Sequence, residues 1–151
     1  MTVRDGDLKA GNGVRRIQLT VGSFSFTGEF ETQAAPNTVR WLAGRLPLHG
    51  IALHARWSGE AGWVPLGVEV RLDPENATTY PHPGQVLLYA GLKSEPELLI
   101  PYGACAFACR AGTLAGSHAI TLTSNVSSLR TMGETLLRGG AQALLLTALD
   151  E

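Results

Sequence analysis

Two residues with complementary chemistry, His54 and Arg56, lie in a stretch that runs from Gly50 to Glu60 and alternates apolar with other side chains. In an extended chain, residues two apart share a face, so we expect the two side chains to project side by side, roughly 7 Å apart. Arginine offers a planar fork of donors to a carboxylate, and histidine can donate or accept a proton. The pair therefore predicts a carboxylate-binding surface. The alternative is a solvated strand face with two ordinary polar residues.

Three nearby side chains extend this candidate site. Trp57 and Trp63 are large enough to form pocket walls, although aromatic residues in barrels more often belong to the core. Glu60 follows a glycine and is either a general base near Arg56 or the salt-bridge partner of that arginine. We include all three as candidate ligand-binding residues.

The segment 72–84 is dense in turn-forming residues and predicts the longest irregular loop, a kind of segment that often carries function. Asn76, Thr78 and Tyr80 alternate along it, and we expect them to reach over the histidine and arginine of the first strand. The alternative is that the asparagine and threonine only stabilise local turns.

Metal and cofactor sites have little support in the sequence. The four histidines show no His-x-x-x-His spacing, and a site assembled from His54, Glu60 and His118 is the one arrangement worth keeping. Cys105 and Cys109 would lie roughly 13 Å apart on one strand, too far for a disulfide with each other. We expect no metal and no cofactor.

No signature of a known catalytic class is present. The chain has no Gly-x-Ser-x-Gly elbow and no glycine-rich phosphate loop between a strand and a helix. Catalytic residues therefore stay unassigned, and the sequence leaves open whether the protein is an enzyme.

The composition fits one folded domain. Of 151 residues, 44% are hydrophobic and 17% charged, and 12 basic residues face 13 acidic ones, which argues against nucleic-acid binding. We expect a flexible tail over 1–14 and a single domain over 15–151. The start has no apolar signal-peptide core and no run could span a bilayer, so we expect a cytoplasmic protein without membrane contact.

Alternation over 16–27 predicts a hairpin, and Pro36 opens a predicted helix that ends at Leu46. Later apolar runs predict further strands over 51–58, 61–66, 85–89, 97–101, 104–108 and 116–123. Together they predict a mainly β fold, a closed antiparallel barrel with one helix after the first hairpin and a C-terminal helix.

The C-terminal helix is expected to begin at Ser124 or Asn125 and to end at the glycine pair 139–140. Residues 141–149 then predict a short apolar helical tail. Because this tail carries three consecutive leucines, we expect it to pack on the body or on a second subunit, and we predict a homo-oligomer formed through the C-terminal region.

Several motifs resemble a small bacterial cyclophilin-like family of unknown function. They are Leu46-Pro-Leu-x-Gly50, His54-Ala-Arg-Trp-Ser-Gly-Glu60, Pro74-Glu-Asn-Ala-Thr78, Pro83-Gly84 before Val86-Leu-Leu-Tyr89, and Pro101-Tyr-Gly103. The resemblance implies a cyclophilin-like barrel and places Arg56 where cyclophilins carry their catalytic arginine. The Gln-Gly-Gly stretch of active prolyl isomerases is absent.

These observations predict a protein that binds a small anionic or carboxylate-bearing molecule in a pocket on the barrel. They leave open whether it also transforms that molecule. The alternatives are a peptide-binding or prolyl isomerase-like domain, whose partner is a short peptide, and a non-catalytic oligomeric module.

Overall fold

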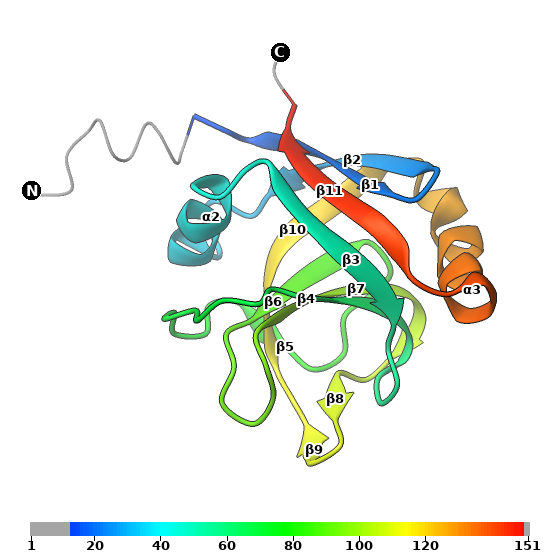
Figure 1. The fold of residues 1–151 in the computed structure, drawn as a ribbon. Helices are drawn as coiled ribbons and strands as arrows, with labels where there is room; N and C mark the ends of the chain where they lie inside the picture. Colours follow the sequence, from blue (N-terminus) through cyan, green and yellow to red (C-terminus); the bar gives the residue numbers. More distant parts are fainter. Residues whose placement is uncertain (1–12, 150–151) are drawn as a thin grey trace, which may run out of the picture.

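The computed structural model describes residues 13–149 and confirms the predicted fold class (Figure 1). Eight antiparallel strands close into a barrel because the last strand of the series pairs with the first. In spatial order they are β2 (Phe24–Phe30), β1 (Arg16–Val21), β11 (Gln142–Ala148), β3 (Leu48–His54), β4 (Gly59–Pro65), β7 (Glu97–Cys105), β6 (Gln85–Tyr89) and β10 (Gly116–Ser124). The predicted tail lies outside the described residues except for its last two positions, and the domain boundary stays a prediction.

Two helices accompany the barrel, as predicted. Helix α2 (Pro36–Ala43) follows the first hairpin, and Glu75 caps it by accepting hydrogen bonds from the backbone nitrogens of Asn37 and Thr38 at 3.3 and 2.8 Å. Helix α3 (Leu129–Gly139) follows a short 3-10 turn, η1 (Val126–Ser128). α2 ends three residues before the predicted Leu46.

The barrel wall separates two apolar clusters. Along β7, Leu98 and Ile100 belong to the main core, whereas Leu99 between them belongs to a second cluster. The alternation of a strand places these two sets on opposite faces of the wall. The second cluster therefore lies on the outer face. The segment 106–115 covers it with Phe107 and Leu114 and contains the small hairpin β8 (Ala108–Cys109) and β9 (Gly112–Thr113).

The predicted C-terminal helical tail is wrong, because residues 142–148 form strand β11. This strand pairs with β1 on one side and β3 on the other, and it buries Leu144 and Leu146 in the core. The run of leucines therefore packs inside its own barrel. These leucines are not an exposed docking tail. The homo-oligomer stays a prediction that nothing in the fold tests.

Two strand boundaries also differ from the predictions. The strand predicted over 51–58 ends at His54, and a turn over 55–58 leads into β4. The strand predicted to end near Pro101 instead continues to Cys105. That proline is tolerated because it lies beyond the part of β7 that pairs with β6, so no ladder hydrogen bond from its nitrogen is needed there.

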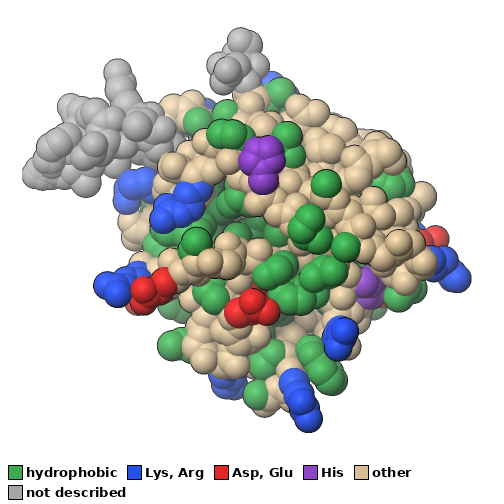
Figure 2. Space-filling model, in the orientation of Figure 1, with side chains coloured by type: hydrophobic (Ala, Val, Ile, Leu, Met, Phe, Trp, Pro, Cys, Tyr) green, Lys and Arg blue, Asp and Glu red, His purple; other side chains and the backbone are tan. Residues whose placement is uncertain are grey.

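One face of the molecule shows no single concentration of charge (Figure 2). In Figure 2, lysine and arginine side chains are scattered among apolar and neutral ones on the face shown. Among residues 13–149, no helix is long and apolar enough to cross a bilayer.

Candidate functional site

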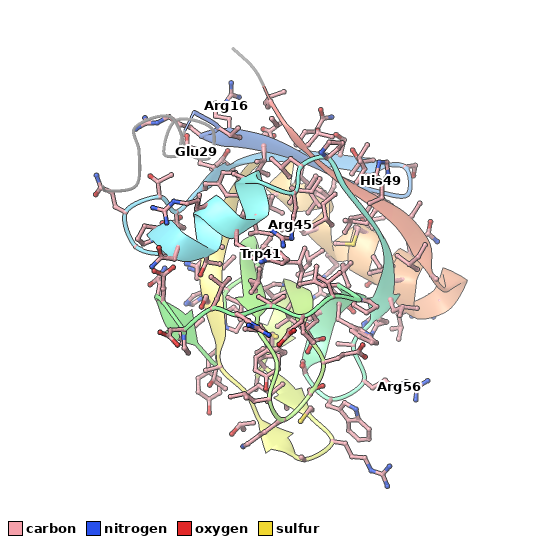
Figure 3. The ribbon with its side chains drawn as sticks, turned by 60° about the vertical axis from the view of Figure 1, so that its left-hand side comes forward. Arg16, Glu29, Trp41, Arg45, His49 and Arg56 are labelled. Atoms are coloured by element: carbon pink, nitrogen blue, oxygen red, sulfur yellow. The ribbon has the colours of Figure 1, made fainter. Side chains whose placement is uncertain are left out.

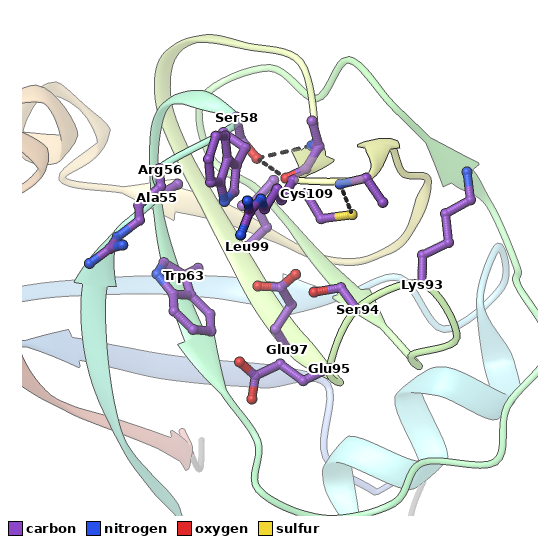
Figure 4. A pocket seen from close by; sticks show the side chains of 14 residues that line it. Ala55, Arg56, Ser58, Trp63, Lys93, Ser94, Glu95, Glu97, Leu99 and Cys109 are labelled. Carbon is purple, nitrogen blue, oxygen red and sulfur yellow. Dashed lines mark hydrogen bonds between the residues drawn. The ribbon is translucent and has the colours of Figure 1, made fainter.

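A cavity of about 560 Å³ opens on the outer face of the barrel (Figure 4). Its walls come from the turn between β3 and β4, the outer faces of β4 and β7, the loop before β7 and the hairpin β8–β9. The chemically capable side chains that line it are Arg56, Trp57, Ser58, Trp63, Lys93, Ser94, Glu95, Glu97, Cys109 and Arg110. A cavity of this size matches the range of small-molecule sites, about 300 to 1,000 Å³.

Ser58 fixes the hairpin against the β3–β4 turn and so forms one side of the cavity. Its hydroxyl donates to the carbonyl of Ala108 at 3.1 Å and lies 3.0 Å from the Ala108 backbone nitrogen, which donates to it. The nitrogen of Ala106 also donates to the Ser58 carbonyl at 2.9 Å. Since Ser58 is buried, these bonds are shielded from water and hold the wall in place.

Two tryptophans give the cavity its apolar surface. Trp63 stands on β4 opposite Leu99 of β7 and packs against the outer apolar cluster. Trp57 lies in the turn and is 55% exposed, an unusual state for so large an apolar side chain. A planar ring placed between them would remove apolar surface of both from water.

Glu97, the first residue of β7, is the one buried carboxylate among the described residues and lines the cavity. It is only 7% exposed, and its side chain forms no hydrogen bond or ion pair within residues 13–149. Burial, and to a smaller extent the negative charge of Glu95, raises the pKa of Glu97 to about 7. Near neutral pH this carboxyl is therefore divided between its protonated and its ionised form.

Three cations border the cavity: Arg56, Lys93 and Arg110. All three are exposed, and every ion pair found in residues 13–149 lies elsewhere. Figure 4 shows the guanidinium of Arg56 at the edge of the cavity rather than over its floor. These cations are available to an anionic group that enters from solvent.

Of the candidates from the sequence, Arg56, Trp57 and Trp63 meet in the cavity, whereas His54 does not line it. His54 lies 2.8 Å from the Tyr102 hydroxyl through Nε2 and 2.8 Å from the Ala55 carbonyl through Nδ1. The expected histidine–arginine pair on one strand face is wrong because the strand ends at His54 and the chain turns before Arg56.

Glu60 pairs with an arginine that the sequence did not suggest. Its Oε1 accepts a hydrogen bond from Nη2 of Arg130 at 2.9 Å, so the expected bridge to Arg56 is wrong. The hydrogen bond from Arg130 is the main reason why the pKa of Glu60 lies below its usual value. Gly103 makes room for the pair, because a Cβ there would lie 2.0 Å from Oε1.

Asn76, Thr78, Tyr80 and His118 do not line the cavity; Asn76 and Thr78 contact β10, the strand that carries His118. The amide of Asn76 donates to the His118 carbonyl at 3.1 Å, and Thr78 pairs with Gly116 of β10 through the short strand β5 (Ala77–Thr78). The Thr78 hydroxyl accepts from the Tyr80 nitrogen at 3.1 Å. Local turn chemistry is therefore what the structure shows for Thr78, whereas the Asn76 side chain bonds across to β10.

The metal arrangement considered for His54, Glu60 and His118 is not assembled. His118 instead lies 2.8 Å from the Thr121 hydroxyl and 3.8 Å from Glu31. Within residues 13–149, no three histidine, cysteine, aspartate or glutamate side chains gather as metal ligands would.

Four residues of the cavity were not predicted from the sequence: Lys93, Glu95, Glu97 and Arg110. One signal was available for Glu97: it shares a strand face with Leu99 in an apolar strand. An acidic residue at such a position has to be explained, because burial disfavours its charged form. The other three residues lie in loops, and no periodicity indicates where loop side chains point.

Comparison with known proteins assigns the chain to a family whose activity is not known. The model of a family described as "Protein of unknown function (DUF3830)" matches residues 17–148. The chain belongs to the DUF3830 family. No curated protein matches it.

Two solved structures share the fold of this DUF3830 protein. One is McbB in complex with tryptophan, with 15% identity and a TM-score of 0.73 over 89% of this chain. The chain spans 45% of the length of McbB. The other is the hypothetical protein AF2241 from Archaeoglobus fulgidus, with 16% identity, a TM-score of 0.57 and coverage of 99% and 100% of the two chains.

Replacing Ser58 by alanine in the DUF3830 protein is expected to loosen the hairpin wall. The change removes both hydroxyl hydrogen bonds to Ala108, which we expect to lower the free energy of unfolding by about 1 to 3 kcal/mol. Amide hydrogen exchange should accelerate over 106–114. Ser94→Ala is the control, because that hydroxyl lines the cavity without such bonds, and equal exchange in both variants would refute the anchoring role.

Glu97 should make the stability of the folded DUF3830 protein fall as pH rises. The folded state holds the carboxyl proton up to a pKa of about 7, whereas the unfolded chain releases it near 4.5. Between these values the folded state binds more protons, so wild-type stability declines through this window, by roughly 3 kcal/mol at most.

In Glu97→Gln this part of the pH dependence should be absent. Urea unfolding of both proteins at several pH values measures it, with Glu95→Gln as control because that side chain is exposed. Parallel stability profiles for wild type and Glu97→Gln would contradict the assignment.

Proposed function

We propose that this protein binds a small molecule that carries a planar ring and a carboxylate, in the cavity between Trp57, Trp63 and the hairpin β8–β9. One observation carries the proposal: an aromatic-walled cavity of about 560 Å³ whose bordering cations have no partners among the described residues. Whether the bound molecule is also transformed is left open.

The chemistry of the lining supports both parts of such a ligand. A ring against Trp63 would bury apolar surface and gain from offset or edge contacts with the indoles, worth about 0.5 to 1.5 kcal/mol beyond burial. A carboxylate at the edge would meet Arg56 and Arg110, whose planar forks bind carboxylates through paired hydrogen bonds.

The fold comparison supports including an indole among the ligands to test, since McbB was solved in complex with tryptophan. At 15% identity the likeness concerns the fold, so the ligand is an inference for this chain. We also propose that the barrel is cyclophilin-like. The closed antiparallel strands, the helix after the first hairpin and the C-terminal helix support this, although the resemblance itself rests on sequence motifs.

The alternative function is a peptide-binding or prolyl isomerase-like domain. Figure 3 shows the Arg56 side chain directed outward from the body, so this residue alone does not distinguish a peptide from a small molecule. The Gln-Gly-Gly stretch of active prolyl isomerases is absent, which favours the small-molecule ligand. A homo-oligomer and a cytoplasmic location are further predictions from the sequence.

A thermal-shift panel tests the proposed function. Indole-3-propionate, indole, propionate, tryptophan and a proline-containing peptide are added separately to the protein. A ligand at a hundred times its dissociation constant adds about 2.7 kcal/mol, which should raise the midpoint by roughly 5 to 10 °C for a domain of this size. We expect indole-3-propionate to exceed both of its fragments.

The double variant Arg56→Ala/Arg110→Ala should lose this difference between whole ligand and fragments. The double variant Arg16→Ala/Arg138→Ala is the control, since it removes the same charge at exposed positions outside the cavity. A shift with the peptide alone would favour the isomerase-like alternative. If no compound raises the midpoint, the proposed binding of a ligand with a planar ring and a carboxylate is refuted.

A further inference from the structure

We propose that the ligand also carries a basic nitrogen and that the Glu97 carboxylate receives it, which makes the preferred ligand a zwitterion of the aromatic amino acid type. This inference rests on the proposed function, and it adds the recognition of a third ligand group. Glu97 lines the cavity, and its surroundings support this role.

Glu97 is held in position by the sheet rather than by side-chain contacts. It pairs with Tyr89 of β6 on one side and Pro65 of β4 on the other, so its backbone lies in the middle of the barrel wall. Its side chain lies on the outer face with Leu99, and Figure 4 shows it beside Trp63. The carboxyl therefore faces the space that a ring between the tryptophans would border.

No side chain or backbone group of the described residues forms a hydrogen bond or ion pair with this carboxyl. The residue is only 7% exposed, and no donor among residues 13–149 bonds to its carboxyl oxygens, whose remaining contact is with the open cavity. A leucine or glutamine there would avoid the cost of burying an ionisable group. An uncompensated acid that lines a cavity is explained if a ligand supplies the missing partner.

The neighbouring charges decide which ligand group fits. Glu95, also in the cavity, adds a second negative charge and would repel a ligand carboxylate placed near Glu97. An ammonium group is favoured by both acids and by the π faces of the adjacent indoles. In an amino acid the ammonium and the carboxylate share one carbon, so the two acids would orient the ammonium inward and turn the carboxylate outward, toward the arginines at the edge.

Binding of an ammonium group is linked to the loss of the Glu97 proton. The other titratable or charged groups that line the cavity or belong to the outer apolar cluster are Arg56, Tyr89, Lys93, Glu95, Cys105, Cys109 and Arg110. Burial holds the pKa of Glu97 near 7 in the free protein, and an ammonium partner lowers it. Affinity for the zwitterion should therefore fall as pH drops below 7, with release of a proton on binding.

Calorimetry with a matched pair of ligands tests the inference. Tryptophan and indole-3-propionate share the ring and the carboxylate, and only tryptophan carries the amine. At about pH 8, where Glu97 is mainly ionised, we expect tryptophan to bind about tenfold to a hundredfold more tightly than indole-3-propionate. At about pH 6 its binding should release a proton, seen as a dependence of the heat on the buffer's ionisation enthalpy.

Glu97→Gln should abolish the preference and the proton release while it keeps or improves the binding of indole-3-propionate. Glu95→Gln, the control, should keep most of the preference. If both ligands bind wild type and Glu97→Gln leaves the preference unchanged, the role of Glu97 is refuted and the proposed function stands. If neither ligand binds wild type, both the proposed function and this inference are overturned.

Discussion

Replacing Gly28 by alanine is expected to lower the free energy of unfolding by about 3 kcal/mol or more, at the upper end of what overpacking costs. Gly28 lies on β2 opposite Leu122 of β10, at the seam that closes the barrel. An added Cβ would lie 2.3 Å from the Thr121 carbonyl oxygen and 2.8 Å from the Leu122 Cα. Both are backbone atoms, so one strand would have to move away from the other.

Chemical unfolding of Gly28→Ala measures this cost, and Gly139→Ala is the matched control. At the control position the nearest atom to an added Cβ is a Thr135 methyl carbon at 3.8 Å, an ordinary contact. We expect the control to keep wild-type stability. If Gly28→Ala stays within about 1 kcal/mol of wild type, the seam is looser than the structure indicates.

Replacing Trp63 by alanine should weaken ligand binding by about 30-fold or more, the size of effect found when a central aromatic contact is truncated. Trp63 is the tryptophan fixed in the barrel wall, opposite Leu99, whereas Trp57 stands in the turn. Its loss removes the surface on which the ring of the ligand rests. Calorimetric titration with indole-3-propionate measures the change.

Trp41→Ala is the control for Trp63→Ala. Trp41 is a partly buried residue of α2, and the guanidinium of Arg45 lies 3.8 Å from its ring centroid (Figure 3). Its truncation should lower stability without changing affinity. Equal losses of affinity in the two variants would mean that binding responds to general destabilisation rather than to the cavity.

Much of the fold could be predicted because its signals are local. The alternation over 16–27 and the proline at the start of α2 each indicated the element that forms. Strand β11 was missed because Leu144, Leu145 and Leu146 lie in a row. Consecutive apolar residues do not distinguish a helix from a barrel strand that pairs with another strand on each side, as β11 does with β1 and β3.

The candidate site was only partly predictable because it depends on contacts between distant segments. Trp57 and Trp63 were recognised as possible walls, but the hairpin that completes the cavity is joined through Ser58 to Ala108, 50 residues away in sequence. Arg130 was missed as the partner of Glu60 for the same reason. Periodicity indicates which face a side chain takes, and not which remote residue it meets.

The most direct test of the cavity as the ligand site is fluorine NMR of protein labelled with 5-fluorotryptophan. The chain has three tryptophans, so three resonances are expected, each assigned by a tryptophan-to-phenylalanine variant. On titration with indole-3-propionate, we predict that the signals of Trp57 and Trp63 shift together with one dissociation constant while that of Trp41 stays in place. A ligand that binds by calorimetry but shifts only Trp41, or none of the three, would contradict the proposed site.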